Sequence, residues 1–352
     1  MSFAVTIIDW FRLNGRTLPW RETRDPYAIW LSEIILQQTR VEQGRPYWER
    51  FMRRWPTVDD LAAATEDEVL REWQGLGYYS RARNLHAAAR QVAARGGFPT
   101  TFEELKALKG VGDYTAAAIG SFAFNLPVAV VDGNVYRVLA RHFGISTPIN
   151  TTEGKKEFTA LAQEQLLPAL NREGQGADLF NQAMMDFGAT LCTPSNPHCE
   201  ECPLMETCVA LREGRISELP VKLRKLKIQE RHITYIYIRY KGETAIRRRP
   251  QGDIWEGLYE PLSPPLTPPQ GRGIRLLRQN VKHVLTHRVI YADFYLWEPD
   301  ERPQLPEGYF WIREEDIDNY GVSRLVEMLF SILNEESHLE LKSHREADLQ
   351  FR

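Results

Sequence analysis

The four cysteines of the chain all lie in one short segment, with the spacing Cys192-x6-Cys199-x2-Cys202-x5-Cys208. A disulfide framework would spread cysteines through the chain, whereas a cluster in an otherwise cysteine-free protein indicates a metal centre and a reducing compartment. Four thiolates in one loop can close around zinc or around an iron–sulfur cluster, and the spacing alone leaves both open. Either centre would be structural, because no thiolate is left over for chemistry.

The rest of the chain reads as a helical region followed by a mixed one. Residues 1–212 carry apolar residues at three- and four-residue spacing, interrupted by glycine-containing breaks, without an alternating strand–helix pattern. A length of 352 residues is long for one core and suits two domains. We expect a linker over 213–230, an α+β domain over 231–338 and a polar tail over 339–352.

The expected elements of the second domain follow from its patterning. Residues 232–240 alternate β-branched and aromatic side chains, and a Lys-Gly-Glu turn and another short run follow, which predicts a β-hairpin. Residues 261–273 form a proline-rich loop, and 287–299 predict a further strand. The segment 308–313, a charged turn and the periodic run 323–333 predict a strand followed by a helix.

Charge and hydropathy give weaker constraints. The net charge of −3 does not by itself indicate a nucleic-acid partner, although a local basic surface can bind phosphates on an acidic protein. No apolar run is long enough to span a bilayer, and residues 1–15 are typical of an amphipathic helix and not of a signal peptide. We expect no membrane association and a cytoplasmic protein associated with the nucleoid.

Two glycines, Gly110 and Gly112, lie between helical runs in the segment 108–115. Glycine lets the backbone approach another backbone or a phosphate closely, and the next helix offers free N–H groups to such a phosphate. A tight turn without a ligand is the alternative. About twenty residues further on, Asp132 ends an apolar run and precedes Gly-Asn. A cap on the helix that starts near Val135 would also explain that aspartate.

The order of glycine hairpin, aspartate and four-cysteine loop resembles the helix-hairpin-helix DNA glycosylases related to endonuclease III. The resemblance implies an all-α glycosylase domain in which Gly110 and Gly112 contact DNA. It also implies that the loop 192–208 binds a [4Fe–4S] cluster that braces a DNA-contacting segment. Relatives that cleave the DNA backbone carry a lysine in the hairpin where this chain has Tyr114, and Lys109 does not match that position. The resemblance therefore implies little or no lyase activity.

The segment 18–41, LPWRETRDPYAIWLSEIILQQTRV, resembles the signature of the MutY family, and residues 75–86 and 180–192 match MutY-like stretches. Within it, Glu33 stands on an otherwise apolar helix, where a carboxylate is costly to bury unless it has a function or a partner. The alternative is a salt bridge, for which the candidate partners are Arg21, Arg24 and Arg40.

Residues 231–338 are similar to the MutT-like (Nudix-fold) C-terminal domain of MutY enzymes. A hydrolytic Nudix domain needs a glutamate-dense helix to hold magnesium, and the chain has no such segment, so the domain should recognise and not hydrolyse. The family's Phe-Ser-His loop, which reads 8-oxoguanine, is matched by Leu285, Thr286 and His287. The hydroxyl and the imidazole are kept, while leucine replaces the aromatic ring. Ordinary polar positions beside a strand are the alternative.

The resemblance implies a monomeric adenine DNA glycosylase that acts on A:8-oxoguanine or A:G mispairs in double-stranded DNA after flipping the adenine. Glu33, with a raised pKa, would protonate adenine at N7. Asp132 would stay ionised and stabilise the oxocarbenium-like sugar. Tyr114 and Asn134 would orient Asp132 and the sugar.

The same match assigns the other DNA contacts. Three residues would enter the duplex near the lesion: Gln38, Thr39 and Tyr78. Tyr78 or Tyr79 could instead be a core residue, and the motif alignment favours Tyr78 for the duplex. Four residues would line the adenine pocket: Arg16, Trp20, Arg21 and Gln182.

Three other functions are weighed against this one. A pyrimidine or thymine-mismatch glycosylase is disfavoured by the Leu36-Gln37-Gln38-Thr39 signature and by the second domain. A non-catalytic iron–sulfur DNA-binding or redox-sensing protein would need neither Glu33 nor Asp132. A nucleotide pyrophosphohydrolase fused to a helical domain is disfavoured by the missing acidic helix.

Overall fold

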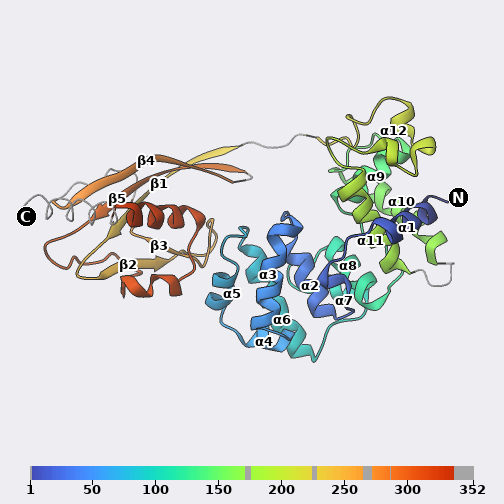
Figure 1. The fold of residues 1–352 in the computed structure, drawn as a ribbon. Helices are drawn as coiled ribbons and strands as arrows, with labels where there is room; N and C mark the ends of the chain where they lie inside the picture. The colour runs from blue at the N-terminus through green and yellow to red at the C-terminus, as the bar shows by residue number, and fades with distance from the viewer. Residues whose placement is uncertain (1, 171–175, 224–227, 265–271, 286, 337–352) are drawn as a thin grey trace, which may run out of the picture. The chain divides into compact units, whose positions relative to one another are not determined.

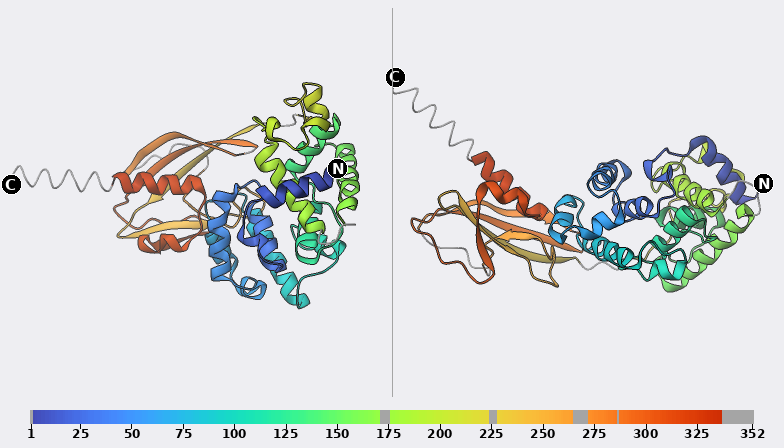
Figure 2. Two further views of the ribbon diagram at one scale, coloured as in Figure 1. Left: turned by 45° about the vertical axis from the view of Figure 1, so that its right-hand side comes forward. Right: turned by 90° about the horizontal axis from the view of Figure 1, so that it is seen from below.

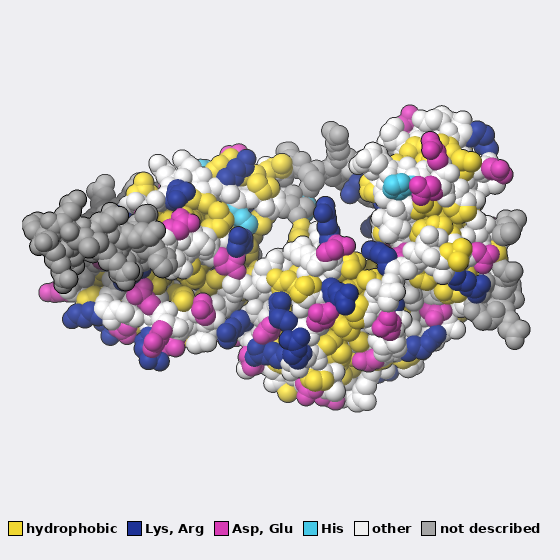
Figure 3. All heavy atoms as spheres, viewed as in Figure 1, with side chains coloured by type: hydrophobic (Ala, Val, Ile, Leu, Met, Phe, Trp, Pro, Cys, Tyr) yellow, Lys and Arg dark blue, Asp and Glu magenta, His cyan; other side chains and the backbone are white. Residues whose placement is uncertain are grey.

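The computed structural model describes residues 2–170, 176–223, 228–264, 272–285 and 287–336. The chain groups into two compact units, one of residues 1–63 with 84–224 and one of residues 64–83 with 225–352. None of the described helices is both long and apolar enough to cross a membrane. On the face seen in Figure 3, basic and acidic side chains are interspersed over the surfaces of both units.

The first unit is helical, as the sequence predicts (Figure 1). Its helices are α1 (Phe3–Asn14), α2 (Pro26–Ile35), α3 (Val41–Arg54), α4 (Val58–Ala63), most of α6 (Ser80–Arg95), α7 (Phe102–Lys106), α8 (Asp113–Phe124), α9 (Gly133–Phe143), α10 (Thr152–Leu170), α11 (Ala177–Asp186) and α12 (Val209–Arg212). Short turns of helix are η1 (Pro19–Arg21), η2 (Phe187–Leu191), η3 (Cys199–Glu201) and η4 (Met205–Thr207).

Local sequence explains where the two site-bearing helices begin. Asp25 caps α2 by accepting the Tyr27 N–H, and Pro26 occupies the first helical position, where a missing N–H does no harm. Asp132 caps α9 in the same way, and Gly144, with φ of 72°, ends that helix in the left-handed region. The buried faces of α1, α9, α10 and α11 form one hydrophobic core. Figure 2 shows the helices of this unit in two further views.

The second unit contains α5 (Glu66–Glu72) and the C-terminal strands. The strands are β1 (Gln229–Ile238), β2 (Glu243–Arg248), β3 (Tyr259–Pro261), β4 (Ile274–Val284), β5 (Arg288–Trp297) and β6 (Tyr309–Arg313), followed by η5 (Glu314–Asn319) and a helix over 324–336. They form two three-stranded sheets, with the orders β1-β5-β4 and β3-β2-β6. The helix 324–336 packs its apolar face against β1 and β5.

The prediction of a β-hairpin formed by β1 and β2 is wrong. Both strands form, but β1 pairs in parallel with β5, and β2 lies between β3 and β6 in the other sheet. Only the bridge from Tyr240 to Glu243 remains of the hairpin. The physical reason is burial: residues 233–238 are buried without alternation, so both faces of this stretch need a covering layer.

Candidate active site

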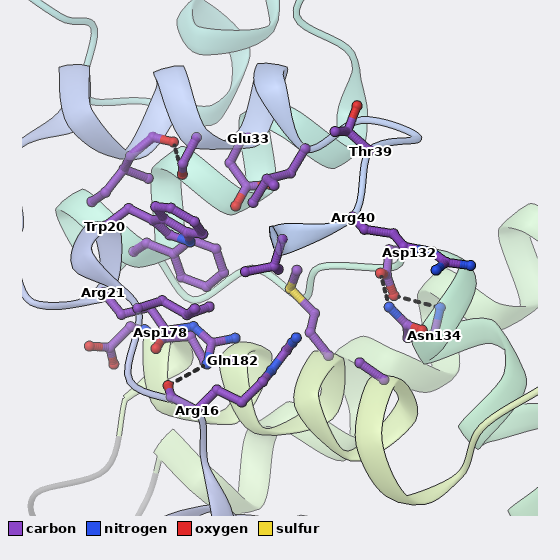
Figure 4. A pocket seen from close by; sticks show the side chains of 18 of the residues that line it. Arg16, Trp20, Arg21, Glu33, Thr39, Arg40, Asp132, Asn134, Asp178 and Gln182 are labelled. Atoms are coloured by element: carbon purple, nitrogen blue, oxygen red, sulfur yellow. Dashed lines mark hydrogen bonds between the residues drawn. The ribbon is translucent and has the colours of Figure 1, made fainter. Parts of the chain in front are cut away.

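The helical unit contains a cavity of about 640 Å³, which lies within the size range of small-molecule sites. Its walls come from η1, α2, the start of α3, α8, α9 and α11 (Figure 4). Nine of the expected catalytic and DNA-contacting residues line it: Arg16, Trp20, Arg21, Glu33, Thr39, Tyr114, Asp132, Asn134 and Gln182.

Glu33 reaches the cavity from α2 and is buried, with 7% of its surface exposed. Burial, helped by the charge of Asp132, raises its pKa from 4.5 to about 7, against the lowering effects of Tyr114 and Arg21. Among the described ion pairs none involves Glu33, because Arg21 binds Asp186 and Arg24 binds Asp178. The raised pKa expected from the apolar helix is therefore present, and the salt-bridge alternative is not.

Asp132 faces the same cavity from the N-terminus of α9 (Figure 4). Its carboxylate accepts the backbone N–H groups of Asn134 and Val135, each at 2.8 Å, and the Asn134 side-chain amide at 2.7 Å. Burial raises the pKa of Asp132, while these hydrogen bonds and Arg137 oppose the shift. Asp132 therefore both caps α9 and faces the cavity.

Tyr114 has a different partner from the one expected. Its hydroxyl donates to Glu33 Oε2 at 2.6 Å, whereas no hydrogen bond joins it to Asp132 among the described residues. The reason is position: Tyr114 lies in the first turn of α8, a helix that packs against α2. Asn134 does contact Asp132, as expected.

Arg16 and Arg21 lie on the wall opposite Glu33 (Figure 4). Both are held by Asp186, a residue that sequence reasoning missed. Asp186 ends α11 and has no exposed surface. It accepts hydrogen bonds from Arg16 Nε at 3.0 Å and from both terminal nitrogens of Arg21 at 2.8 Å. The 180–192 stretch contained it, but no local signal marked it as a partner of residues far away in the chain.

Gln182 and Trp20 complete the wall. Within the described part of the chain, the Gln182 side-chain amide has no hydrogen-bond partner, so its donor and acceptor are available to a ligand. Trp20 is buried and packs edge-on against Trp48, with ring centroids 5.6 Å apart.

Arg137, also missed from the sequence, joins the Asp132 turn to the cysteine loop. Its guanidinium donates to Asn134 Oδ1 at 2.8 Å, Gly188 O at 2.6 Å and Cys192 O at 2.7 Å. The side chain is nearly buried, so these bonds satisfy a charge that would otherwise be costly to desolvate.

The glycine segment 108–115 forms the tight connection between α7 and α8. Gly110 has φ of 75°, and a Cβ there would lie 2.6 Å from Asn84 Cβ. Gly112 is the N-terminal cap of α8 and has open space around it. The first position therefore requires glycine for the fold, while the second leaves the backbone accessible at a helix N-terminus.

The residues expected to enter the duplex are distributed over both units. Thr39 lines the cavity, while Gln38, next to it, does not and has φ of 56°. Tyr78 belongs to the second unit and is 46% exposed, with φ of 49°. Tyr79 is buried and donates its hydroxyl to Val322 O, which fits the core role considered for it.

The expected lesion-reading loop is the connection between β4 and β5. The Leu285 N–H donates to Arg288 O at 2.8 Å and closes the turn. His287 is exposed in this turn, and Thr286 lies outside the described residues. His283, near the end of β4, packs against Trp255, with ring centroids 6.0 Å apart.

The four cysteines surround a common void of about 30 Å³. The buried Arg141 guanidinium donates to Cys192 Sγ at 3.5 Å and to Thr193 O at 2.7 Å, so it places a positive charge beside the sulfurs. Among the described residues, no group of three or more His, Cys, Asp or Glu side chains is placed to hold a metal ion. The four thiols nevertheless line one void beside a cation, a donor set that fits an anionic iron–sulfur cluster.

Comparison with known families agrees with this geometry. Residues 31–164 match the HhH-GPD superfamily of base excision DNA repair proteins, residues 192–208 match the iron-sulfur binding domain of endonuclease III, and residues 234–331 match the NUDIX domain. Fold and site together define a helix-hairpin-helix DNA repair glycosylase with an iron–sulfur loop and a Nudix-like second domain.

Relatives narrow this class. The adenine DNA glycosylase of Buchnera aphidicola subsp. Schizaphis graminum is 36% identical over 260 residues, which are 73% of this chain and 73% of its own. That of Rattus norvegicus is 43% identical over 233 residues, 62% of this chain and 44% of its own. The chain therefore belongs to the MutY-type adenine DNA glycosylase family.

Solved structures support the same fold. A thermostable thymine-DNA glycosylase has a TM-score of 0.54 and 31% identity, and the match covers 60% of this chain and 95% of that chain. An endonuclease III–DNA complex, at 21% identity and a TM-score of 0.50, is similar in fold.

Proposed function

We propose that this protein excises adenine mispaired with 8-oxoguanine or guanine from double-stranded DNA. The observation that carries the proposal is the pairing of two unlike carboxyl groups, Glu33 and Asp132, in one cavity. Burial raises the pKa of both groups, to about 7 for Glu33, which has no ion pair among the described residues. Asp132 differs because three hydrogen bonds from Asn134 and Val135 favour its charged form. These different surroundings suit Glu33 as the acid and Asp132 as the anion.

Glu33 supplies the proton. Adenine leaves poorly as an anion, so Glu33 protonates N7 of the flipped base, and the electron pair of the bond to the sugar moves to N9 as that bond breaks. The base departs as neutral adenine, and the sugar is left as an oxocarbenium-like cation. The Asp132 carboxylate stabilises this cation until water adds, and the ionised Glu33 takes up the proton that water releases.

Recognition of the base falls to the opposite wall. The Gln182 amide offers both a donor and an acceptor, as an adenine edge requires. The Arg16 and Arg21 guanidinium groups and the Trp20 ring fix the shape of that wall. Tyr114, where lyase-competent relatives have lysine, has no amine to attack the sugar, so the enzyme is monofunctional.

Cys192, Cys199, Cys202 and Cys208 would hold a [4Fe–4S] cluster, which supplies structural bracing of the loop and no bond cleavage. Because thiolates are its ligands, a Cys199→Ser variant should lose the visible absorption of the purified protein. Retention of that absorption in the variant, or its absence from the native protein, would contradict this ligand set.

Analysis of the released base tests the proposed activity. The purified protein is incubated with duplexes that contain A, T or U opposite G or 8-oxoguanine. Release of adenine alone, with an intact abasic strand until alkali is added, supports the proposal. Release of thymine or uracil would instead support a pyrimidine glycosylase, and strand cleavage without alkali would refute the monofunctional assignment.

A further inference from the structure

Asp186 is a buried charged group that binds two arginines of the cavity wall, and the mechanism above does not use it. Its side chain is fully buried, yet two arginines lower its pKa to about 2, so it remains ionised. Its oxygens accept the Arg16 backbone N–H at 2.9 Å and the two terminal nitrogens of Arg21 at 2.8 Å. A buried charge of this kind persists only because its partners are present.

The bidentate bond fixes where Arg21 points. Asp186 uses both terminal nitrogens of that guanidinium, and a further bond runs from Arg21 Nη1 to Arg16 O at 3.1 Å. Arg21 is also the cation whose charge acts on Glu33. If its partner were lost, the guanidinium would seek another carboxylate in the same cavity, and Glu33 lacks an ion-pair partner among the described residues.

We propose that Asp186 is a positioning residue that holds Arg21 away from Glu33 and so keeps Glu33 unpaired and able to donate its proton. The inference rests on the proposed function, since it assigns a role to Asp186 only if Glu33 is the acid. A Glu33–Arg21 ion pair would convert Glu33 into a carboxylate near neutral pH, and a carboxylate cannot protonate the base.

The charged and titratable groups around Glu33 are few. Tyr114 faces it from α8, Asp132 from the turn before α9, and Arg21 from η1. Arg40, the N-cap of α3, and Glu42, in its first turn, line the same cavity. Arg16 lines the cavity as well, and Asp186 binds both Arg16 and Arg21. Of these two arginines only Arg21 has a charge that acts on Glu33, so we expect the Asp186 variant to act on Glu33 through Arg21.

The test is the pH dependence of single-turnover adenine excision by Asp186→Asn, measured from about pH 5.5 to 9. Excision should fall as pH rises through the Glu33 pKa, and in the variant this fall should begin at lower pH. If the pKa drops by one unit, the rate at pH 8 falls about tenfold, whereas the rate near pH 5.5 changes little. An equal loss at every pH would overturn the inference, because a merely structural role lowers the whole profile.

Arg21→Gln should shift the pH profile of excision in the opposite direction. It also keeps the inference testable if the Asp186→Asn variant misfolds. Removing the cation that acts on Glu33 should move the fall in rate to higher pH, whatever the plateau rate becomes. The double variant Arg21→Gln with Asp186→Asn should lose the downward shift of Asp186→Asn. A double variant that keeps the downward shift of Asp186→Asn would overturn the inference, because the shift would then not depend on Arg21.

Glu33→Gln separates the two proposals. If that variant excises adenine normally, the proposed function fails, whatever Asp186 does. If Glu33→Gln is inactive and the profile of Asp186→Asn is unmoved, the proposed function stands and only the role of Asp186 fails.

Discussion

A single carboxyl group on an apolar helix governs the chemistry at the residue scale. Glu33 is buried, and its pKa of about 7 lies well above the ordinary value of 4.5. The same desolvation that makes its proton available near neutral pH also makes the ionised form unfavourable in the folded protein. Catalytic use and stability should therefore oppose each other at this position.

Glu33→Gln should stabilise the protein, and more so at alkaline pH. The pKa of Glu33 is higher in the folded protein than in the unfolded chain. The contribution of Glu33 to stability is therefore complete below about pH 4.5 and is lost as pH rises through about 7. The loss at pH 8 is on the order of 3 kcal/mol. Thermal unfolding at pH 5 and pH 8 checks this: the gain in Tm should be larger at pH 8, and an equal gain at both would contradict it.

Tyr114→Phe should move the pH profile of excision upward. The Tyr114 hydroxyl bond to Glu33 Oε2 lowers the pKa of Glu33, so its loss leaves burial less opposed. The fall in single-turnover rate should then begin at higher pH than in the native enzyme. Tyr79→Phe, which removes a hydroxyl outside the cavity, is the matched control and should leave the profile unmoved. A downward shift in Tyr114→Phe would refute the assigned contact.

Sequence motifs indicated the two carboxyl groups and the Asn134 partner of Asp132, but not Tyr114 as the partner of Glu33. Glu33 and Asp132 were marked by local patterns, an apolar helix and a capping position. The bond from Tyr114 to Glu33 spans 81 positions and that from Arg21 to Asp186 spans 165. Such pairs depend on how helices pack, and no periodicity within one segment contains that information.

At the scale of elements, amphipathic helices were predictable and the strands less so. The strand β4 was missed because its residues are mostly exposed and polar, with register irregularities opposite β5, so it lacks a hydrophobic alternation. The β1–β2 hairpin was wrong because short-range turn signals say nothing of a parallel partner that comes much later in the chain.

The connection between α7 and α8 should tolerate a methyl group at one glycine only. Gly110→Ala places a Cβ against Asn84 and forces a left-handed φ, so it should destabilise the protein by about 1–2 kcal/mol or more. Gly112→Ala, with open space and an ordinary φ, is the matched control and should change stability by a few tenths of a kcal/mol. Urea unfolding measures both, and equal effects would contradict the geometry.

At the scale of the whole molecule, the second unit is built from two distant parts of the sequence. Gln74 Nε2 donates to Glu327 Oε1 at 2.6 Å, and Tyr259 Oη donates to Asp67 Oδ2 at 3.1 Å. Domain boundaries drawn from composition alone assign 64–83 to the helical region, whereas its contacts group it with the C-terminal strands.

Removal of residues 225–352 should therefore affect more than lesion recognition. The truncation would leave segment 64–83 without the partners of Gln74, Tyr79 and Asp67. We expect a lower thermal unfolding midpoint and a stronger tendency to aggregate, because apolar surface becomes exposed. If the truncated protein unfolded at the same temperature as the full-length protein, this packing would contribute nothing to the stability of the remaining helices.

The central claim is that the Glu33 proton drives excision. The most direct measurement is the single-turnover rate of adenine release from an A:8-oxoguanine duplex by Glu33→Gln at neutral pH, with mispair affinity measured on the same sample. The account predicts a rate lower by about 10²–10⁴-fold with affinity preserved. Native-like release of adenine by that variant would contradict it.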